Sequence, residues 1–163
     1  GRHDEFARRV DHAREWLRQA TPKTTEEALM MLWGLEWSGA EKQEVAAAGR
    51  AVLAMQRADG GWAQLETLGT DAYATGKALV ALRETGVLQP ADAAYRQGVR
   101  YLMNSQQQDG SWIVKSRAFP FQPLKESGFP HGRDQWISAA GTAWASMALS
   151  YALDAADTRV AAR

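Results

Sequence analysis

The 163-residue chain contains no cysteine. This absence excludes disulfide bonds, thiolate nucleophiles and metal sites built on cysteine, and it gives no indication of the redox compartment. No run of about 18 apolar residues is present, so no transmembrane segment is expected. The amino-terminal stretch GRHDEFARRV is charged and lacks the apolar core of a signal peptide, so the sequence assigns no localisation.

The chain also lacks an excess of charge of either sign, because 19 basic residues balance 19 acidic ones. A neutral chain without a basic stripe has no electrostatic footprint for nucleic acid or an anionic membrane. The histidines, His3, His12 and His131, show no ligand spacing, so no metal and no cofactor are expected. An Asp–Ser–His hydrolytic triad can be assembled on paper, but nothing in the sequence places such residues together.

What the chain does have is apolar residues at helical spacing, and almost nothing that alternates like a strand. The pattern predicts six helices: roughly Asp4 to Gln19, Thr24 to Trp37, about Glu41 to Gln56, Asp71 to Gly86, a fifth with Pro90 as its first residue, and Ser138 to Leu153. Thr24, Asp71 and Ser138 are residue types that cap helix starts, and Thr24 with Glu27 indicates a capping box. The sequence therefore predicts one all-α domain over residues 1–163.

A seven-residue phrase occurs twice, as QRADGGW and as QQQDGSW, at positions 50 residues apart. The shared positions are Gln56, Asp59, Gly60 and Trp62 in the first copy and Gln106, Asp109, Gly110 and Trp112 in the second. Asp-Gly is a turn signal, and each copy falls where one predicted helix leads to the next.

The helices that follow these turns are alike as well. TTEEALMMLWGL, DAYATGKALVAL and SAAGTAWASMAL begin at Thr24, Asp71 and Ser138, and each is preceded by a more amphipathic helix. This pattern is typical of a helical-hairpin repeat of about 50 residues, whose units hide their apolar faces by stacking on neighbours. Small residues such as Gly76 and Gly141 indicate close approach of these inner helices.

These features resemble the squalene–hopene and oxidosqualene cyclases, with the wider prenyltransferase and squalene oxidase repeat group, whose hallmark is a repeated Gln-x-x-x-Gly-x-Trp phrase. GTAWASMAL, residues 141–149, is similar to a helix near the carboxyl terminus of those cyclases, and ESGFP, residues 126–130, is similar to their Gly-Phe-Pro stretch. The resemblance covers roughly Thr24 to Leu153. It implies an α/α toroid of which six helices are half, so that either the chain is the C-terminal part of a longer protein or two copies complete the ring.

The resemblance gives the repeated phrase an architectural role. In such proteins the Gln amide bonds neighbouring backbone and the Trp ring stacks across it, so that the pair clasps successive hairpins. A Trp at a turn also contributes a large buried area, which supports the same role for Trp62 and Trp112 here. Asp59 and Asp109 are expected to be turn-makers rather than a catalytic pair.

The same resemblance locates the expected catalytic acid. The cyclases protonate their substrate from an Asp-x-Asp-Asp motif, which here falls on Asp71, Ala72, Tyr73 and Ala74. A phenol with a reference pKa of about 10 is far too weak an acid to protonate an alkene. Cyclase chemistry is therefore not expected, and Asp71 is expected to be mainly a helix cap. The zinc site of the related prenyltransferases is excluded because it uses a cysteine.

The segment between Trp112 and Ser138 is about 20 residues longer than its counterpart in the first repeat, because the inner helices begin 47 and then 67 residues apart. We call residues 113–137 the flap. It is interpreted either as a rigid cover over helix ends or as a binding wall at the toroid mouth, to which Arg117 also belongs. The candidate ligand-binding residues are Asp71, Tyr73, Phe119, Phe121, Phe129, His131, Arg133, Asp134, Trp136 and Trp144.

Three functions stay open from the sequence. The first is binding of an apolar ligand, an isoprenoid among the candidates, without cyclase activity. The second is a non-catalytic interaction module of a multidomain protein, and the third is an active triterpene cyclase fragment. A deep aromatic-lined pocket would favour the first function, whereas a filled, dry interior would favour the second.

The two ends of the helix series differ. The first helix carries its charges away from a stripe of Phe6, Val10 and Leu17, and is expected to form a polar cap. The last helix has no charged residue from Ser138 to Leu153. A helix that is apolar or small on every face is normally buried all round. We therefore expect its remaining face to meet a second copy of the chain or the rest of a longer parent.

Overall fold

The computed structural model describes residues 1–119 and 124–161, with the side chains of the last helix described as far as Leu153. Its elements are α1 (Arg2–Gln19), α2 (Thr25–Trp37), α3 (Lys42–Ala54), α4 (Ala72–Glu84), α5 (Ala93–Ser105), a 3-10 turn η1 (Gly132–Asp134) and α6 (Gln135–Ala161). The described ranges hold no strand beyond one isolated bridge between Trp62 and Asp71. The predicted all-α fold of helical hairpins is confirmed.

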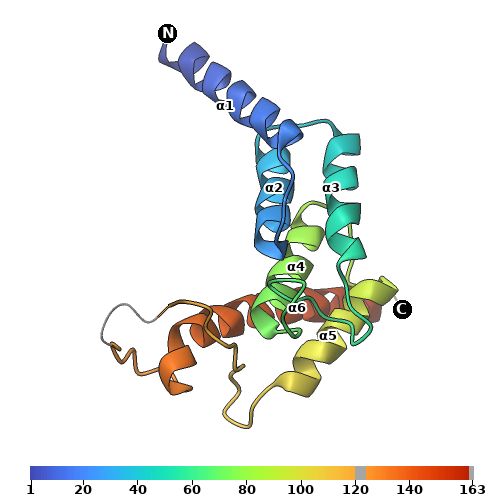
Figure 1. Ribbon diagram of the computed structural model, residues 1–163. Coiled ribbons are helices and arrows are strands. Elements are labelled where there is room, and N and C mark those ends of the chain that lie inside the picture. The colour runs from blue at the N-terminus through green and yellow to red at the C-terminus, as the bar shows by residue number, and fades with distance from the viewer. Residues whose placement is uncertain (120–123, 162–163) are drawn as a thin grey trace.

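The central helix is α4, which packs against α2, α3, α5 and α6 (Figure 1). Every residue of α4 from Ala74 to Leu82 is buried. Its closest neighbour is α6, because a Cβ added at Gly76 would lie 2.6 Å from the backbone nitrogen of Ala145. Only glycine allows the two backbones to approach so closely. This contact fixes the crossing of the two helices that flank the candidate site.

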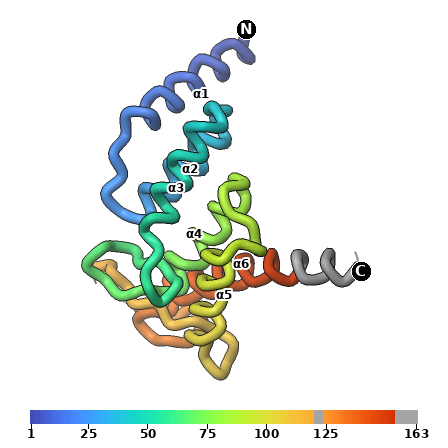
Figure 2. Tube along the Cα trace, turned by 90° about the vertical axis from the view of Figure 1, so that its right-hand side faces the viewer, coloured from blue at the N-terminus to red at the C-terminus, as the bar shows by residue number. Residues whose placement is uncertain are grey.

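In contrast, α1 projects from the rest of the molecule, as both views show (Figures 1 and 2). It has no buried residue, and the side chains of Phe6 and Val10 are 59% and 43% exposed. Only its carboxyl-terminal end packs, where Leu17 covers Gly34 and Arg18 forms an ion pair with Glu44. The predicted apolar stripe therefore meets the body of the protein at one end alone.

Two helix starts follow the predicted caps. The hydroxyl of Thr24 accepts a hydrogen bond from the backbone nitrogen of Glu27 at 3.1 Å, and the carboxylate of Asp71 accepts one from Ala74 at 2.9 Å. The predicted capping box is incomplete, because the Glu27 carboxylate accepts from the backbone of Lys23 instead of that of Thr24.

Two other helix starts were predicted wrongly. α5 begins at Ala93 rather than Pro90, because the carboxylate of Asp92 accepts a backbone bond in the preceding residues and holds them in a turn. α6 begins at Gln135 rather than Ser138, since η1 runs directly into it. Ser138 is fully buried, and its hydroxyl accepts a bond from the flap backbone instead of capping the helix.

The two copies of the repeated phrase form the same turn. Trp62 and Trp112 are 0% and 2% exposed, and each indole Nε1 donates a 2.8 Å hydrogen bond. The acceptors are the carbonyls of Val52 in α3 and Leu102 in α5. Each carbonyl lies ten residues before its tryptophan, so each ring fastens the turn to the helix that precedes it.

The remaining bonds of the two turns also correspond. The side-chain amide of Gln56 donates to the Gly60 carbonyl at 2.7 Å, and that of Gln106 donates to the Gly110 carbonyl at 2.9 Å. The carboxylates of Asp59 and Asp109 accept from the backbone nitrogens of Gly61 and Ser111, both at 3.0 Å. The backbone nitrogens of Trp62 and Trp112 donate to the hydroxyls of Thr75 at 2.9 Å and Thr142 at 3.1 Å. The last pair reaches forward to α4 and α6. Each turn therefore links the helix before it to the helix after it.

Side-chain hydrogen bonds join the two ends of the flap and hold it in place. Asp134 accepts from the ammonium of Lys115 at 2.8 Å, and this bond lowers the pKa of the Asp134 carboxyl below its usual value. The amide of Gln135, which is fully buried, bonds Ser127 and the carboxylate of Glu126. These bonds hold the flap against the first turn of α6.

The outer face of α6 is only partly covered. Ala145 and Ala148 are fully buried, whereas Met147 and Leu153 are 41% and 67% exposed. Over the described ranges, none of the helices combines the length and apolar character that crossing a bilayer requires. The expected burial of this helix on all sides is therefore not met within one copy of the chain.

Candidate ligand-binding cavity

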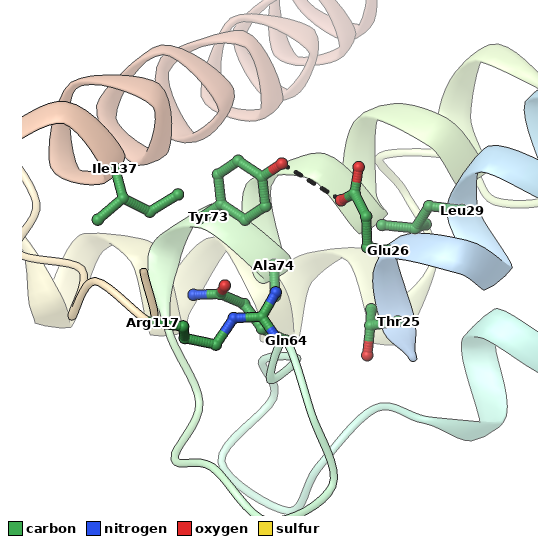
Figure 3. A pocket seen from close by; sticks show the side chains of 8 residues that line it. All are labelled: Thr25, Glu26, Leu29, Gln64, Tyr73, Ala74, Arg117 and Ile137. Atoms are coloured by element: carbon green, nitrogen blue, oxygen red, sulfur yellow. Dashed lines mark hydrogen bonds between the residues drawn. The ribbon is translucent and has the colours of Figure 1, made fainter. Parts of the chain in front are cut away.

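A cavity of about 170 Å³ lies where the amino-terminal turns of α2, α4 and α6 meet (Figure 3). Its lining residues are Thr25, Glu26 and Leu29 of α2, Tyr73 and Ala74 of α4, Ile137 of α6, Gln64 of the first repeated turn and Arg117 of the flap. Three of the lining residues are apolar and the other five carry polar or charged groups, so the cavity offers both apolar surface and several hydrogen-bonding groups to a small molecule.

One wall of the cavity is a hydrogen-bonded network. The Tyr73 hydroxyl donates to Glu26 Oε2 at 3.2 Å (Figure 3), and the Lys77 ammonium pairs with the other carboxylate oxygen, Oε1. Burial, and after it the neighbouring Glu26 carboxylate, raises the pKa of Tyr73 above its ordinary value. The phenol therefore stays a neutral hydrogen-bond donor, and the carboxylate is committed to two partners.

Behind this wall, the Lys77 ammonium lies inside an aromatic box. Lys77 is only 6% exposed. Its Nζ lies 5.7 Å from the ring centroid of Trp33, 5.6 Å from that of Tyr73 and 5.5 Å from that of Trp144. A buried ammonium is costly unless it is paired. Here Glu26 and three ring faces compensate the lost hydration.

The aromatic box continues as a row of indoles. The ring centroids of Trp33 and Trp144 are 5.7 Å apart, and the two ring planes are tilted by 33°. Trp37 stacks on Trp33 with the ring centroids 6.0 Å apart and an angle of 10° between the ring planes. The carboxylate of Glu84 accepts from Trp33 Nε1 at 2.9 Å and from the Tyr151 hydroxyl at 3.1 Å. α2, α4 and α6 therefore share one aromatic surface whose rings are held by hydrogen bonds and by each other.

Asp71 is not among the residues that line the cavity. Its carboxylate accepts from the backbone of Ala74 at 2.9 Å and from the Gln64 amide at 3.0 Å. Burial raises the pKa of Asp71, against the hydrogen bonds that lower it. Asp71 therefore caps α4 and holds Gln64, and Gln64 is the residue that faces the cavity.

The candidate residues from the sequence do not form a single site. Tyr73 lines the cavity, and Trp144 belongs to the aromatic box beside it. Phe119 and Trp136 are 80% and 60% exposed, and Phe121 lies outside the described residues. Of the described flap side chains that were considered for a binding wall, Arg117 alone lines this cavity.

The other flap candidates lie elsewhere. Asp134 is bonded to Lys115, which joins the two ends of the flap, and Arg133 is exposed. Phe129 lines a second cavity of about 490 Å³ beside the second repeated turn. The ring of His131 contacts that of Phe129 edge-on, with the centroids 6.2 Å apart. His131 has φ of 84°, a left-handed conformation that is uncommon for a residue other than glycine.

The structure does bring an aspartate, a serine and a histidine together at this second cavity. Ser111 Oγ lies 2.6 Å from Asp109 Oδ1 and 2.6 Å from His131 Nε2. The bonds from Ser111 lower the pKa of Asp109, so its carboxylate is an ionised acceptor for the hydroxyl proton. A hydrolytic triad needs the carboxylate on the imidazole instead. The cluster therefore links flap and turn rather than activating Ser111.

Sequence reasoning named Tyr73 and Trp144 but missed the other residues of the wall and the box. Glu26, Trp33 and Trp37 share one face of α2, a spacing that signals a helical stripe but not its use. Lys77 follows Tyr73 by one helical turn, which puts both on one side of α4. The decisive contact, Lys77 with Glu26, joins residues 51 positions apart and leaves no local signal.

No group of three or more His, Cys, Asp or Glu side chains is placed to hold a metal ion in the part of the chain that the structure describes. No family model matches the chain, and neither does any curated protein or solved structure. Fold and site define the class of the molecule directly. It is an all-α helical-hairpin domain with a cavity and an aromatic surface between three of its helices.

Proposed function

We propose that the chain is a terpene-cyclase-like repeat domain that binds an apolar ligand, with isoprenoids as the first class to test, and does not cyclise it. The observation that carries this proposal is the cavity between α2, α4 and α6. Leu29, Ile137 and Ala74 supply its apolar surface, and Tyr73 separates it from the aromatic box. This apolar surface favours burial of an apolar ligand, and the polar groups of the lining can fix its orientation.

The proposed absence of cyclase activity is supported by the hydrogen-bond partners of the two carboxyl groups nearest the cavity. Among the described residues, Glu26 is the one carboxyl group that lines the cavity, and it is bonded to both Lys77 and Tyr73. Asp71 caps α4 and faces Gln64. Protonation of an alkene requires a carboxylic acid whose proton is aimed at the substrate, whereas these two carboxyl groups are directed at the partners named here.

Extraction of the purified protein with organic solvent, followed by mass spectrometry, tests the binding proposal. We expect a co-purified apolar molecule, and a rise in melting temperature when farnesol is added as a probe. The variant Ala74→Met adds volume at the cavity wall and should abolish both signals. Ala143→Met, on the exposed side of α6, is the matched control. A clean extract together with an unchanged melting temperature would contradict the proposal.

A separate prediction concerns catalysis. Incubation with squalene or oxidosqualene, followed by gas chromatography, should give no cyclic triterpene, because Tyr73 is held by Glu26 and is a weak acid. Any cyclic product above the level of a boiled sample would show that another residue supplies the proton.

A second candidate function is an interaction module. It is favoured by one observation, the projecting α1 with Phe6 and Val10 exposed. Exposed apolar residues at adjacent turns of a helix are typical of a face that meets another protein. The ligand experiment tests the first function, and the deletion of residues 1–12 described below tests whether α1 has a partner.

A further inference from the structure

Arg117 of the flap brings a positive charge to the lining of the cavity beside Tyr73. Its side chain extends from the flap toward Gln64 and Ala74 in the close view of the cavity (Figure 3). Within the described residues its guanidinium forms no hydrogen bond and no ion pair. A guanidinium is always charged in proteins and carries five N–H donors, so its capacity to bind an acceptor is unused here.

The carboxyl groups around the cavity are bonded to other partners. Glu26, which lines the cavity, pairs with the ammonium of Lys77 and accepts from the hydroxyl of Tyr73. Asp71 is used as the cap of α4. Because the charges of Glu26 and Lys77 compensate each other, Arg117 supplies the unpaired charge among the lining residues that the structure describes.

Hydrogen bonds fix the backbone on both sides of Arg117. The carboxylate of Asp134 accepts from the backbone nitrogen of Ser116 at 2.9 Å and from the ammonium of Lys115 at 2.8 Å. The backbone nitrogen of Ala118 donates to the hydroxyl of Ser116 at 3.3 Å. A binding group on a fixed backbone needs less ordering when a ligand arrives, so more of the contact energy is retained.

Gln64 gives the cavity a second polar group in a fixed place. Its side chain is buried, and its Nε2 donates to the carboxylate of Asp71 at 3.0 Å. A side-chain amide has two N–H groups, and the other one forms no hydrogen bond within the described residues. Arg117 and Gln64 therefore both offer N–H donors to a ligand whose apolar part lies against Leu29 and Ile137.

We propose that the cavity binds an apolar carboxylic acid, with its carboxylate on the guanidinium of Arg117 and its hydrocarbon body against Leu29 and Ile137. This inference rests on the proposed function and names the head group of its ligand. A planar guanidinium donates two parallel N–H bonds to a carboxylate, which makes the pair both strong and directional. One unpaired positive charge matches one negative charge, whereas a diphosphate brings more negative charge than the lining compensates and would face Glu26.

Three ligands with the same hydrocarbon body test the head group: geranic acid, geraniol and geranylamine. At about pH 7.5 the first is an anion, the second is neutral and the third is a cation. We expect isothermal titration calorimetry to show that geranic acid binds about tenfold more tightly than geraniol, and that geranylamine binds most weakly. Equal affinity of geranic acid and geraniol would overturn the head-group inference and leave the proposed function in place. No binding of any of the three would overturn both.

Variants locate the carboxylate. Arg117→Gln should lower the affinity for geranic acid to that for geraniol, and Arg117→Lys, which keeps the charge without the planar fork, should retain part of the preference. Arg50→Gln, at an exposed position of α3, is the matched control and should bind all three ligands as the native chain does. Ala74→Met should abolish binding of both geranic acid and geraniol, because it fills the cavity. Undiminished binding of geranic acid to Arg117→Gln or to Ala74→Met would overturn the inference.

Discussion

At the scale of single residues, the two repeated turns form a matched pair. Each places one indole in the interior and gives its N–H to a carbonyl of the preceding helix. The ring fills volume in the core, and the hydrogen bond pairs the buried indole N–H with a helix carbonyl. Both effects act on the same junction between two hairpins, so the loss of one side chain removes both together.

We predict that Trp62→Ala and Trp112→Ala each reduce the free energy of unfolding by about 3–5 kcal/mol, the range for removal of a buried large aromatic. Trp16→Ala, at a position 69% exposed, should change it little. Chemical denaturation of the three variants is the measurement. If both turn variants unfolded like the control, the turns would not hold the hairpins together.

Asp71 gives a pH dependence with a defined sign. Because burial raises its pKa in the folded chain, the unfolded chain releases the proton at lower pH. The contribution of Asp71 to stability is therefore largest below the unfolded pKa and falls as pH rises toward the folded pKa. Asp71→Asn keeps a capping oxygen but cannot ionise. We predict that the stability of the variant lacks this decline when the free energy of unfolding is measured across the acid range. Parallel curves of stability against pH for the variant and the native chain would contradict the prediction.

The residues that could be predicted are those whose partners are close in sequence. Thr24 and Asp71 cap helices through bonds three residues away, and the repeated phrase closes its turns within a few residues. Lys77 could not be assigned from the sequence, because its carboxylate partner and two of its three rings come from other helices. A lysine with no local partner is normally expected at the surface.

At the scale of elements, α1 shows what periodicity leaves undetermined. Its apolar spacing correctly indicates a helix with one apolar face. The spacing does not tell which surface covers that face, and in the structure only Leu17 is covered, by Gly34 of α2. The starts of α5 and α6 were missed for local reasons of a different kind, since the bond from the Gln89 backbone to the Asp92 carboxylate sets the first and the 3-10 turn η1 leads directly into the second.

We predict that deletion of residues 1–12 changes the free energy of unfolding by less than about 1 kcal/mol, as for other exposed positions. Leu17→Ala should cost more, about 1–2 kcal/mol, because its side chain is the one that packs on α2. Thermal melts of both variants decide the matter. A larger loss from the deletion than from Leu17→Ala would mean that the projecting part of α1 has a partner in solution.

At the scale of the whole molecule, apolar side chains remain uncovered on α1 and on the outer face of α6. The neighbouring helices cover α4 at the centre of the molecule, but these two surfaces stay exposed in a single copy of the chain. A two-fold contact between copies would be self-complementary and would cover the α6 surface on both.

We predict that the chain self-associates at micromolar concentration and that Met147→Glu weakens the association, because it places a charge on the open face of α6. Met103→Glu is the control, since Met103 is 63% exposed and belongs to α5 rather than α6. Sedimentation velocity of the three proteins is the measurement. A native chain that stays monomeric at every concentration would show that copies of it do not meet there.

The close contact between α4 and α6 has a consequence for synthesis of the chain on the ribosome. α4 is the most buried helix, yet its nearest partner begins only at Gln135. The nascent chain therefore carries an apolar helix without its cover while the intervening residues are still being added. Contacts between distant segments also form late for entropic reasons. The hairpin of α2 and α3 emerges first and covers one side of α4. The nascent chain is therefore most prone to aggregation, and most in need of a chaperone, until α6 leaves the exit tunnel.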